Sequence, residues 1–275
     1  MLNFAANLHY LFTEVPFMAR FEAAARAGFK GVEFQVPYDF APEQLAAELR
    51  RHDLKMVLFD APMGDWSQGD RGLAAVPGRE AEFRSGLPRA LTYARALSCD
   101  LVHVMAGVVG PDADMNAAER TYVENLRHAA EYFKPHGVRC VIEPINRLMG
   151  IVQGGPSYTT QGMHGYFLNY SHQARRIMER VASDNLFLHL DVYHMQMTEG
   201  HLAETLKTHV EVLKHVQIAG VPGRHEPNVG EIHYPYLFDL LDTLGYDGWV
   251  GCEYRPRHGT AAGLGWAEAY GIRAS

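Results

Sequence analysis

Four oxygen-bearing side chains close four short apolar runs in the second half of the chain: Glu143, Asp191, Gln217 and Glu253. Taken singly, each has a common alternative explanation as a salt-bridge partner or a cap at the end of a strand. Taken together, three carboxylates in one place would repel each other unless a cation or bound protons neutralised them. Hard oxygen ligands suit Mg²⁺ or Mn²⁺, and the absence of His and Cys from the four makes Zn²⁺ a poorer match. The residue types therefore predict a divalent metal site.

Two further side chains flank this set and could handle a substrate. His194 comes three residues after Asp191, where we expect a loop; the alternative is a purely structural loop residue. Arg224 lies in the Gly- and Pro-rich run after the third of the four residues. A guanidinium is the natural two-pronged partner of a carboxylate or phosphate, so Arg224 is predicted to bind an acidic substrate. The alternatives for Arg224 are a solvated loop charge, or pairing with Glu226 or Glu231 to hold the loop.

The elements that would position these residues alternate along the whole chain. Strands are expected at residues 3–7, 31–34, 56–60, 101–105, 139–143, 186–191, 215–218 and 249–253. Helices are expected at residues 16–27, 42–50, 81–97, 117–133, 172–181, 202–209 and 236–244, with a last one beginning near Gly263. Eight strands in strict alternation with helices predict an α/β fold, a single (β/α)8 TIM barrel over residues 1–275. The C-terminal ends of the strands line the active site of such barrels, and the four oxygen-bearing residues fall there.

Composition narrows the class of protein. The chain has 275 residues, close to the roughly 250 of such barrels, with 47% hydrophobic and 21% charged residues. A formal net charge of −7 argues against a nucleic-acid binder, which needs a basic face. No run reaches the roughly 18 apolar residues of a membrane span, and the N-terminus lacks the charged region of a signal peptide. We therefore expect a soluble, cytoplasmic protein with neither nucleic acid nor membrane as partner.

One long connection stands out against this regular pattern. Residues 146–165 are rich in Gly and polar residues and show no periodicity. Loops of this length inside a compact domain are usually functional, so we expect this one to lie over the C-terminal mouth of the barrel.

Segments over most of the chain resemble the hydroxypyruvate isomerase family of the xylose-isomerase-like TIM barrels. They include Ile142-Glu-Pro-Ile-Asn146, Asp191-Val-Tyr-His-Met-Gln196, the loop from Gln217 to Pro227 and Gly248-Trp-Val-Gly-Cys-Glu-Tyr254. The resemblance places an acid–base pair on Glu143 and Glu253. It places the ligands of a Mg²⁺ or Mn²⁺ ion on Glu143, Asp191, Gln217 and Glu253. It implies isomerisation of a small hydroxy-carbonyl acid, hydroxypyruvate to tartronate semialdehyde or a related 2-oxo-tetronate-type acid, by proton transfer between adjacent carbons.

The chain departs from the family pattern at two places that face the mouth. Asp60 stands where the family usually has Asn, and the stretch 147–165 is longer than the usual connection. Both departures bear on the size and charge of the substrate more than on the reaction.

Three alternatives to the isomerase remain. A ketose 3-epimerase would use the same two glutamates, but such enzymes typically carry a further Glu where this chain has Met149. A barrel of this kind could also bind a sugar acid without turning it over. Repair of nucleic acid, as by endonuclease IV, is the least supported, because its zinc cluster needs additional His ligands and its partner needs positive charge. The sequence is compatible with a homo-oligomer.

Overall fold

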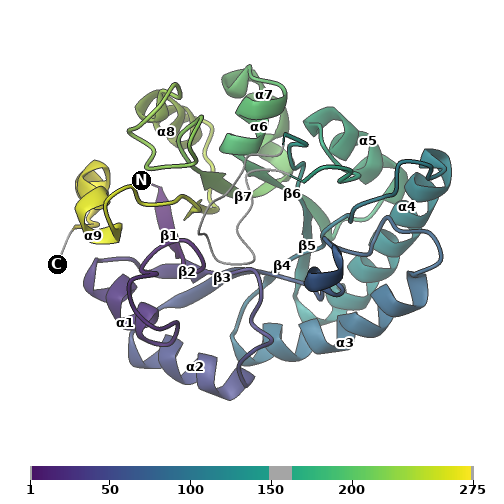
Figure 1. Cartoon of the computed structure of the whole chain (residues 1–275), viewed down its shortest axis with the longest axis horizontal. Coiled ribbons are helices and arrows are strands. Elements are labelled where there is room, and N and C mark those ends of the chain that lie inside the picture. Colours follow the sequence, from purple (N-terminus) through teal and green to yellow (C-terminus); the bar gives the residue numbers. More distant parts are fainter. Residues whose placement is uncertain (1, 149–162, 274–275) are drawn as a thin grey trace.

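The computed structural model describes residues 2–148 and 163–273, and it has the predicted α/β fold. Eight parallel strands close into a barrel in chain order, and the helices form a ring around them (Figure 1). The strands are β1 (Asn3–Asn7), β2 (Gly31–Glu33), β3 (Lys55–Asp60), β4 (Leu101–His103), β5 (Arg139–Ile142), β6 (Leu186–Asp191), β7 (Leu213–Ile218) and β8 (Trp249–Cys252). Each strand lies beside the next, and β8 closes the barrel against β1.

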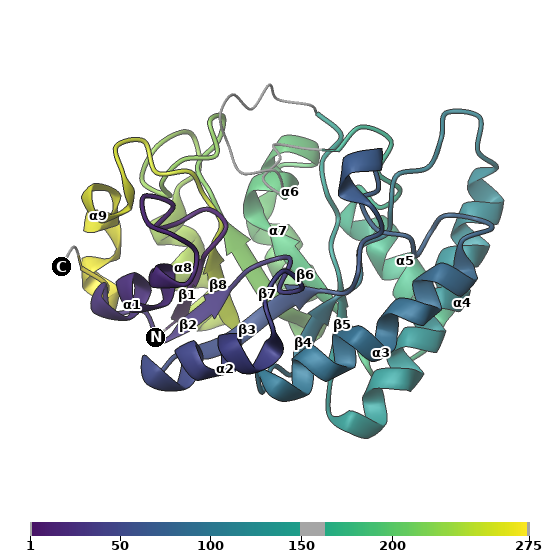
Figure 2. The ribbon, with the colours of Figure 1, turned by 60° about the horizontal axis from the view of Figure 1, so that its bottom comes forward.

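Helices follow the strands on the outside of the barrel, and α1, α2 and α3 lie side by side along one flank (Figure 2). The α-helices are α1 (Ala19–Arg26), α2 (Pro42–Arg51), α3 (Glu80–Ala96), α4 (Met115–Phe133), α5 (Ser171–Val181), α6 (Val192–Thr198), α7 (Leu202–His209), α8 (Tyr234–Thr243) and α9 (Thr260–Gly263). Short 3₁₀ turns are η1 (Trp66–Gln68), η2 (Lys134–His136), η3 (Val210–Val212) and η4 (Leu264–Tyr270). Local sequence explains several starts: Pro42 opens α2, where its missing N–H costs no hydrogen bond, and Asp114 caps α4 by accepting from the Asn116 backbone N–H at 2.9 Å.

The predicted elements are all present, with shifted ends. The strands expected to include Glu143 and Glu253 end at Ile142 and Cys252, so both glutamates are the first residues after their strands. Among the residues that the structure describes, the one α-helix that the sequence pattern did not indicate is α6, which begins directly after β6 at Val192. A helix of seven residues is too short to show a clear helical period in the sequence, which is why it was not predicted. His194 therefore lies in a helix and not in the expected loop.

The strand register sets the polar residues of the mouth beside each other. Asn7 of β1 pairs with Glu33 of β2, and Asp191 of β6 pairs with Gln217 of β7. Since side chains alternate along a strand, residues two apart on one strand share a face. The barrel interior at this end is therefore polar, in contrast to the Val, Ile and Leu layers usual in such barrels.

Two other predictions concern the loop at residues 146–165 and the absence of a membrane span. The loop expected at 146–165 over the mouth falls mostly in residues 149–162, outside the described residues. Within the described ranges, no helix is long and apolar enough to span a membrane.

Candidate active site

A pocket opens at the end of the barrel where the strands finish, and four carboxylates line it: Glu33, Asp60, Glu143 and Glu253. Imidazoles, amides and aromatic rings complete the wall, with His103, His189, His194, Gln217, Gln35, Tyr10 and Trp66 among them. Of the described residues that line it, Arg224 alone carries a permanent positive charge. The pocket is therefore strongly acidic and suited to a bound cation.

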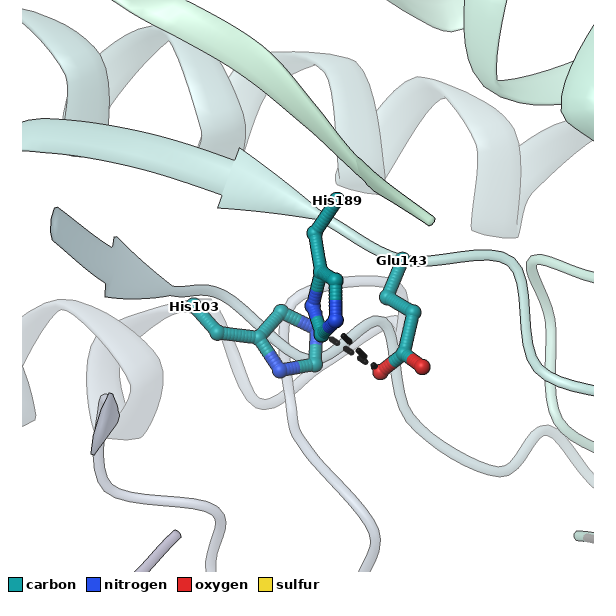
Figure 3. Close-up of side chains that lie close together, drawn as sticks. All are labelled: His103, Glu143 and His189. Carbon is teal, nitrogen blue, oxygen red and sulfur yellow. Dashed lines mark ion pairs between the residues drawn. The ribbon is translucent and has the colours of Figure 1, made fainter. Parts of the chain in front are cut away.

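Glu143 lines this pocket and is nearly fully buried, at 5% exposure. Its Oε2 is 3.9 Å from Nε2 of His103 and 3.8 Å from Nδ1 of His189, and Figure 3 shows both rings turned toward this carboxylate. These distances exceed those of hydrogen bonds. Among the described residues, Oε1 of Glu143 has no hydrogen-bond partner. Burial, followed by the charges of Asp191 and Glu253, raises the pKa of Glu143 well above its ordinary value.

Asp191 has two structural partners as well as a place in the site. Its Oδ1 accepts from the Tyr193 backbone N–H at 2.8 Å and so caps α6. Its Oδ2 lies 2.9 Å from Nη2 of Arg224 and 3.5 Å from Nε2 of His194. Burial raises the pKa of Asp191, and the charge of Arg224 opposes that effect.

Glu253 faces Glu143 from the end of β8. Gln35 donates to its Oε1 at 2.6 Å, and Arg224 donates to its Oε2 at 2.6 Å. Burial raises the pKa of Glu253 well above its ordinary value, with Arg224 again opposing. Two buried glutamates that favour the protonated form therefore flank one pocket.

Arg224 is buried, at 2% exposure, and is not the solvated loop charge that was one alternative. The loop folds back tightly after β7: the Gly220 N–H donates to the His225 carbonyl at 2.8 Å, and a Cβ at Gly230 would come within 1.9 Å of the Val221 carbonyl oxygen. Arg224 has a positive φ of 55°, which is uncommon for a residue with a side chain and typical of functional sites.

The partners of Arg224 also differ from those considered for it. Its guanidinium lies 5.0 Å from the ring centres of both Tyr10 and Tyr193, and it pairs with Asp191 and Glu253. Glu226 accepts from the Arg257 backbone N–H, and Glu231 accepts from the side chain of Gln196. Burial would lower the pKa of Arg224, but Glu253 and the neighbouring tyrosines and Asp191 raise it above its ordinary value.

His194 is buried in α6, where its Nδ1 lies 2.6 Å from the amide nitrogen of Asn146. Because that amide nitrogen is a donor, Nε2 of the neutral ring carries the proton and faces Asp191 and, at 4.0 Å, Glu143. Burial lowers the pKa of His194 well below its ordinary value. An N–H donor at this place suits a substrate oxygen better than a metal ion.

Three of the four predicted metal ligands, Glu143, Gln217 and Glu253, line the pocket, and Asp191 lies beside them without lining it. Glu143 and Asp191 lie with His194 at the spacing of ligands around one ion, and Gln217 is the register neighbour of Asp191. Glu253 joins Asp191 through Arg224. A second set with that spacing, not anticipated from the sequence, consists of His103, Glu143 and His189 (Figure 3). The histidine-free ligand environment that disfavoured Zn²⁺ is thus not what surrounds Glu143.

Several site residues escaped the sequence reasoning: Glu33, His103, His189 and His215. His189 and His215 each precede a predicted ligand by two residues on the same strand, and the period of a strand puts both members of such a pair on one face. That spacing was a usable signal. Nδ1 of His103 lies 3.0 Å from Oδ1 of Asp60, which gives the departure from Asn at position 60 a partner.

Comparisons with known proteins agree with this geometry. A family model described as "Xylose isomerase-like TIM barrel" matches residues 21–270. A 2-oxo-tetronate isomerase of Cupriavidus necator is 50% identical over 270 residues, which cover 98% of this chain and 99% of that protein. A hydroxypyruvate isomerase of Escherichia coli is 42% identical, with 98% and 100% covered. A crystal structure from Brucella melitensis described as "AP endonuclease, family 2" superposes with a TM-score of 0.91 at 46% identity, covering 98% of this chain and 99% of that one.

Proposed function

Since the chain belongs to the xylose isomerase-like TIM barrel family, and within it to the hydroxypyruvate isomerase family, we propose that it moves a proton between adjacent carbons of a small 2-oxo-3-hydroxy acid. The chain is an isomerase of the hydroxypyruvate-isomerase type, acting on sugar acids. Hydroxypyruvate and 2-oxo-tetronate share the unit that such an enzyme needs: a carboxylate, a carbonyl at C2 and a C–H with a hydroxyl at C3.

The observation that carries the proposal is the pair of buried glutamates facing one pocket from the ends of β5 and β8. One of them, as a carboxylate, removes the C3 proton, and the other, as a carboxylic acid, delivers a proton to C2. Burial raises the pKa values of both, and a carboxyl group whose pKa is raised is better suited to act as an acid in one direction and as a base in the other. Gln35 and Arg224 fix the orientation of Glu253.

The residues present also fit a divalent cation. Glu143 has a buried oxygen without a hydrogen-bond partner among the described residues, beside Asp191 and close to neutral His194. We propose that Glu143, Asp191, Gln217 and Glu253 hold Mg²⁺ or Mn²⁺, since carboxylate and amide oxygens are the ligands such ions prefer. When bound, the ion would polarise the carbonyl and hydroxyl oxygens of the substrate and stabilise the negative charge that develops there.

Arg224 and His194 remain the proposed contacts to substrate. Arg224 lines the pocket, where its guanidinium lies beside the rings of Tyr10 and Tyr193 and donates through Nη2 to Asp191 and Glu253. A carboxylate of the substrate would bind to this guanidinium. His194, with its proton on Nε2, would donate to a substrate hydroxyl or carbonyl oxygen.

The description of the Brucella structure as an AP endonuclease raises cleavage of damaged DNA as a second activity. A net charge of −7 and a pocket lined by four carboxylates oppose a polyanionic substrate. We therefore propose the isomerase activity alone.

A substrate panel tests this choice. The enzyme is incubated with Mn²⁺ and, separately, hydroxypyruvate, 2-oxo-tetronate and a six-carbon ketose, and products are identified by NMR. We expect conversion of one or both 2-oxo acids and none of the ketose. Conversion of the ketose to its C3 epimer, with the acids untouched, would favour the epimerase; binding of the acids without any product would favour a sugar-acid binding barrel.

A further inference from the structure

Glu33 connects three strands at the floor of the site. It closes β2, is 1% exposed, and accepts at Oε1 from Nδ2 of Asn7 at 3.0 Å and from Nε2 of Gln217 at 2.7 Å. Its Oε2 lies 2.6 Å from Nε2 of His215. A buried carboxylate is costly unless it is paired, and this one accepts hydrogen bonds from side chains of β1 and β7 and lies beside the ring of His215.

The contact with Gln217 decides which end of that amide is available to a ligand. Nε2 of Gln217 donates to Oε1 of Glu33, so the amide presents its nitrogen to this carboxylate. The carbonyl oxygen of the amide is then left for a ligand in the pocket that Gln217 lines. A flipped amide would instead present N–H groups, which repel a cation.

Glycine at position 251 lets Glu33 reach Gln217 across the barrel. Gly251 of β8 is the register partner of Gln217, and a Cβ there would lie 2.4 Å from both carboxylate oxygens of Glu33. Real Cβ atoms essentially never come so close, so any side chain at 251 would displace the carboxylate. The space that Gly251 leaves is therefore filled by the head group of Glu33.

From these contacts we infer that Glu33 is a positioning residue: it holds the Gln217 amide with its carbonyl oxygen toward the metal site, in the space that Gly251 provides. The inference rests on the proposed function, in which Gln217 is a metal ligand. Glu33 lines the pocket but is not one of the proposed metal ligands. It acts through Gln217, so its effect must disappear when residue 217 has no amide to orient.

The test is the affinity of the metal-stripped protein for Mn²⁺, measured by titration calorimetry. Glu33→Gln keeps the shape of the side chain but leaves one acceptor atom for the donors that meet there. Gly251→Ala keeps the charge of Glu33 but moves its carboxylate. Each is measured with Gln217 present and in the Gln217→Ala background, which forms a double-mutant cycle. Asp60→Asn is the matched control, since it removes a pocket carboxylate that is not a partner of Gln217. Melting temperatures confirm that every variant is folded.

We expect Glu33→Gln and Gly251→Ala each to weaken Mn²⁺ binding by about tenfold when Gln217 is present and by less than about twofold when it is absent, on the scale of one hydrogen bond. Asp60→Asn should have the same effect in both backgrounds, because charge acts at a distance. Equal losses in both backgrounds, or no loss from either variant, would overturn the inference alone. If either variant is unfolded, the other decides. If the wild-type protein does not bind Mn²⁺, the metal of the proposed function is wrong and the inference falls with it.

Discussion

The guanidinium of Arg224 binds Glu253 through Nη2, at 2.6 Å from Oε2, and the same nitrogen lies 2.9 Å from Oδ2 of Asp191. One cation thus joins a predicted catalytic acid to a predicted metal ligand. Because all three side chains are buried, the pairing is protected from solvent screening and fixes the direction of Glu253. Arg224 therefore has a structural role besides its proposed role in binding a substrate carboxylate. Its replacement should affect both the orientation of Glu253 and the binding of an acidic substrate.

Replacement of either glutamate of the acid–base pair should stop turnover without unfolding the protein. Glu143→Gln and Glu253→Gln keep the size of the side chain but cannot exchange a proton, and general acid–base catalysis typically contributes roughly 10²–10⁴-fold. Steady-state kinetics measures the loss. Glu226→Gln is the matched control, since Glu226 is also buried but does not line the pocket. Activity within about threefold of wild type in either pocket variant would refute the assigned roles.

Loss of Asp191 and Gln217 should show first in metal affinity. Asp191→Asn removes one of the three carboxylates among the proposed ligands and should weaken Mn²⁺ binding by at least about tenfold. Gln217→Leu removes a neutral ligand and should have the smaller effect. Calorimetry on metal-stripped protein gives both values. The surface variant Asp184→Asn, which removes only an exposed partner of Lys134, controls for net charge. Unchanged Mn²⁺ affinity in both pocket variants would show that these residues are not ligands.

Arg224→Ala should impair acidic substrates more than neutral ones. A charge-assisted hydrogen bond to a carboxylate contributes about 1.5–3 kcal/mol, so KM for hydroxypyruvate should rise roughly ten- to over a hundredfold. Turnover of dihydroxyacetone, which has no carboxylate, should fall only through the loss of the contacts to Glu253 and Asp191.

Two further variants complete the Arg224 experiment. Arg224→Lys should rescue KM only partly, because an ammonium cannot reproduce the planar donor geometry. Arg257→Ala, at an exposed position of the neighbouring segment, should leave both substrates unaffected. Equal losses of kcat/KM on the charged and the uncharged substrate would show that Arg224 acts only through its contacts within the protein and does not bind the substrate carboxylate.

His9 should make the protein less stable in mild acid. Burial, with a smaller contribution from Arg20, lowers the pKa of His9 to about 4 despite its hydrogen bond with Gln35, against an ordinary 6.5. Between these two values the unfolded chain binds a proton that the folded chain does not. The free energy of unfolding therefore falls as pH drops from 6.5 to about 4, by up to about 3 kcal/mol from this group.

The variant His9→Gln isolates that contribution. It removes the titrating ring but keeps a donor that can reach Gln35. Urea unfolding at several pH values between 4 and 7 should show a shallower decline for the variant than for wild type. Parallel curves for the two proteins would mean that His9 does not titrate as its burial implies.

The barrel and the residues at its mouth could be predicted from the sequence, because each short apolar run marks a strand and the end of the run marks the end of that strand. Glu143, Asp191, Gln217 and Glu253 were identified by that logic: Glu143, Gln217 and Glu253 line the pocket, and Asp191 is the register neighbour of Gln217. What the pattern could not give was the direction of Arg224, which depends on a tight loop with a positive φ and on two partners on other strands. Nor could it give Glu33, whose partners Asn7, His215 and Gln217 are joined only by closure of the barrel.

The central claim is that Glu143 and Glu253 move a proton between adjacent carbons of a 2-oxo-3-hydroxy acid. The most direct measurement is NMR of hydroxypyruvate in D₂O with Mn²⁺-loaded enzyme that is cleared of paramagnetic ion before the spectra, against a control without enzyme. The account predicts deuterium at C3 of recovered hydroxypyruvate and at C2 of tartronate semialdehyde, at rates lowered at least about a hundredfold by Glu143→Gln. Hydroxypyruvate that keeps its protons at the rate of the enzyme-free control, with no tartronate semialdehyde formed, would contradict it.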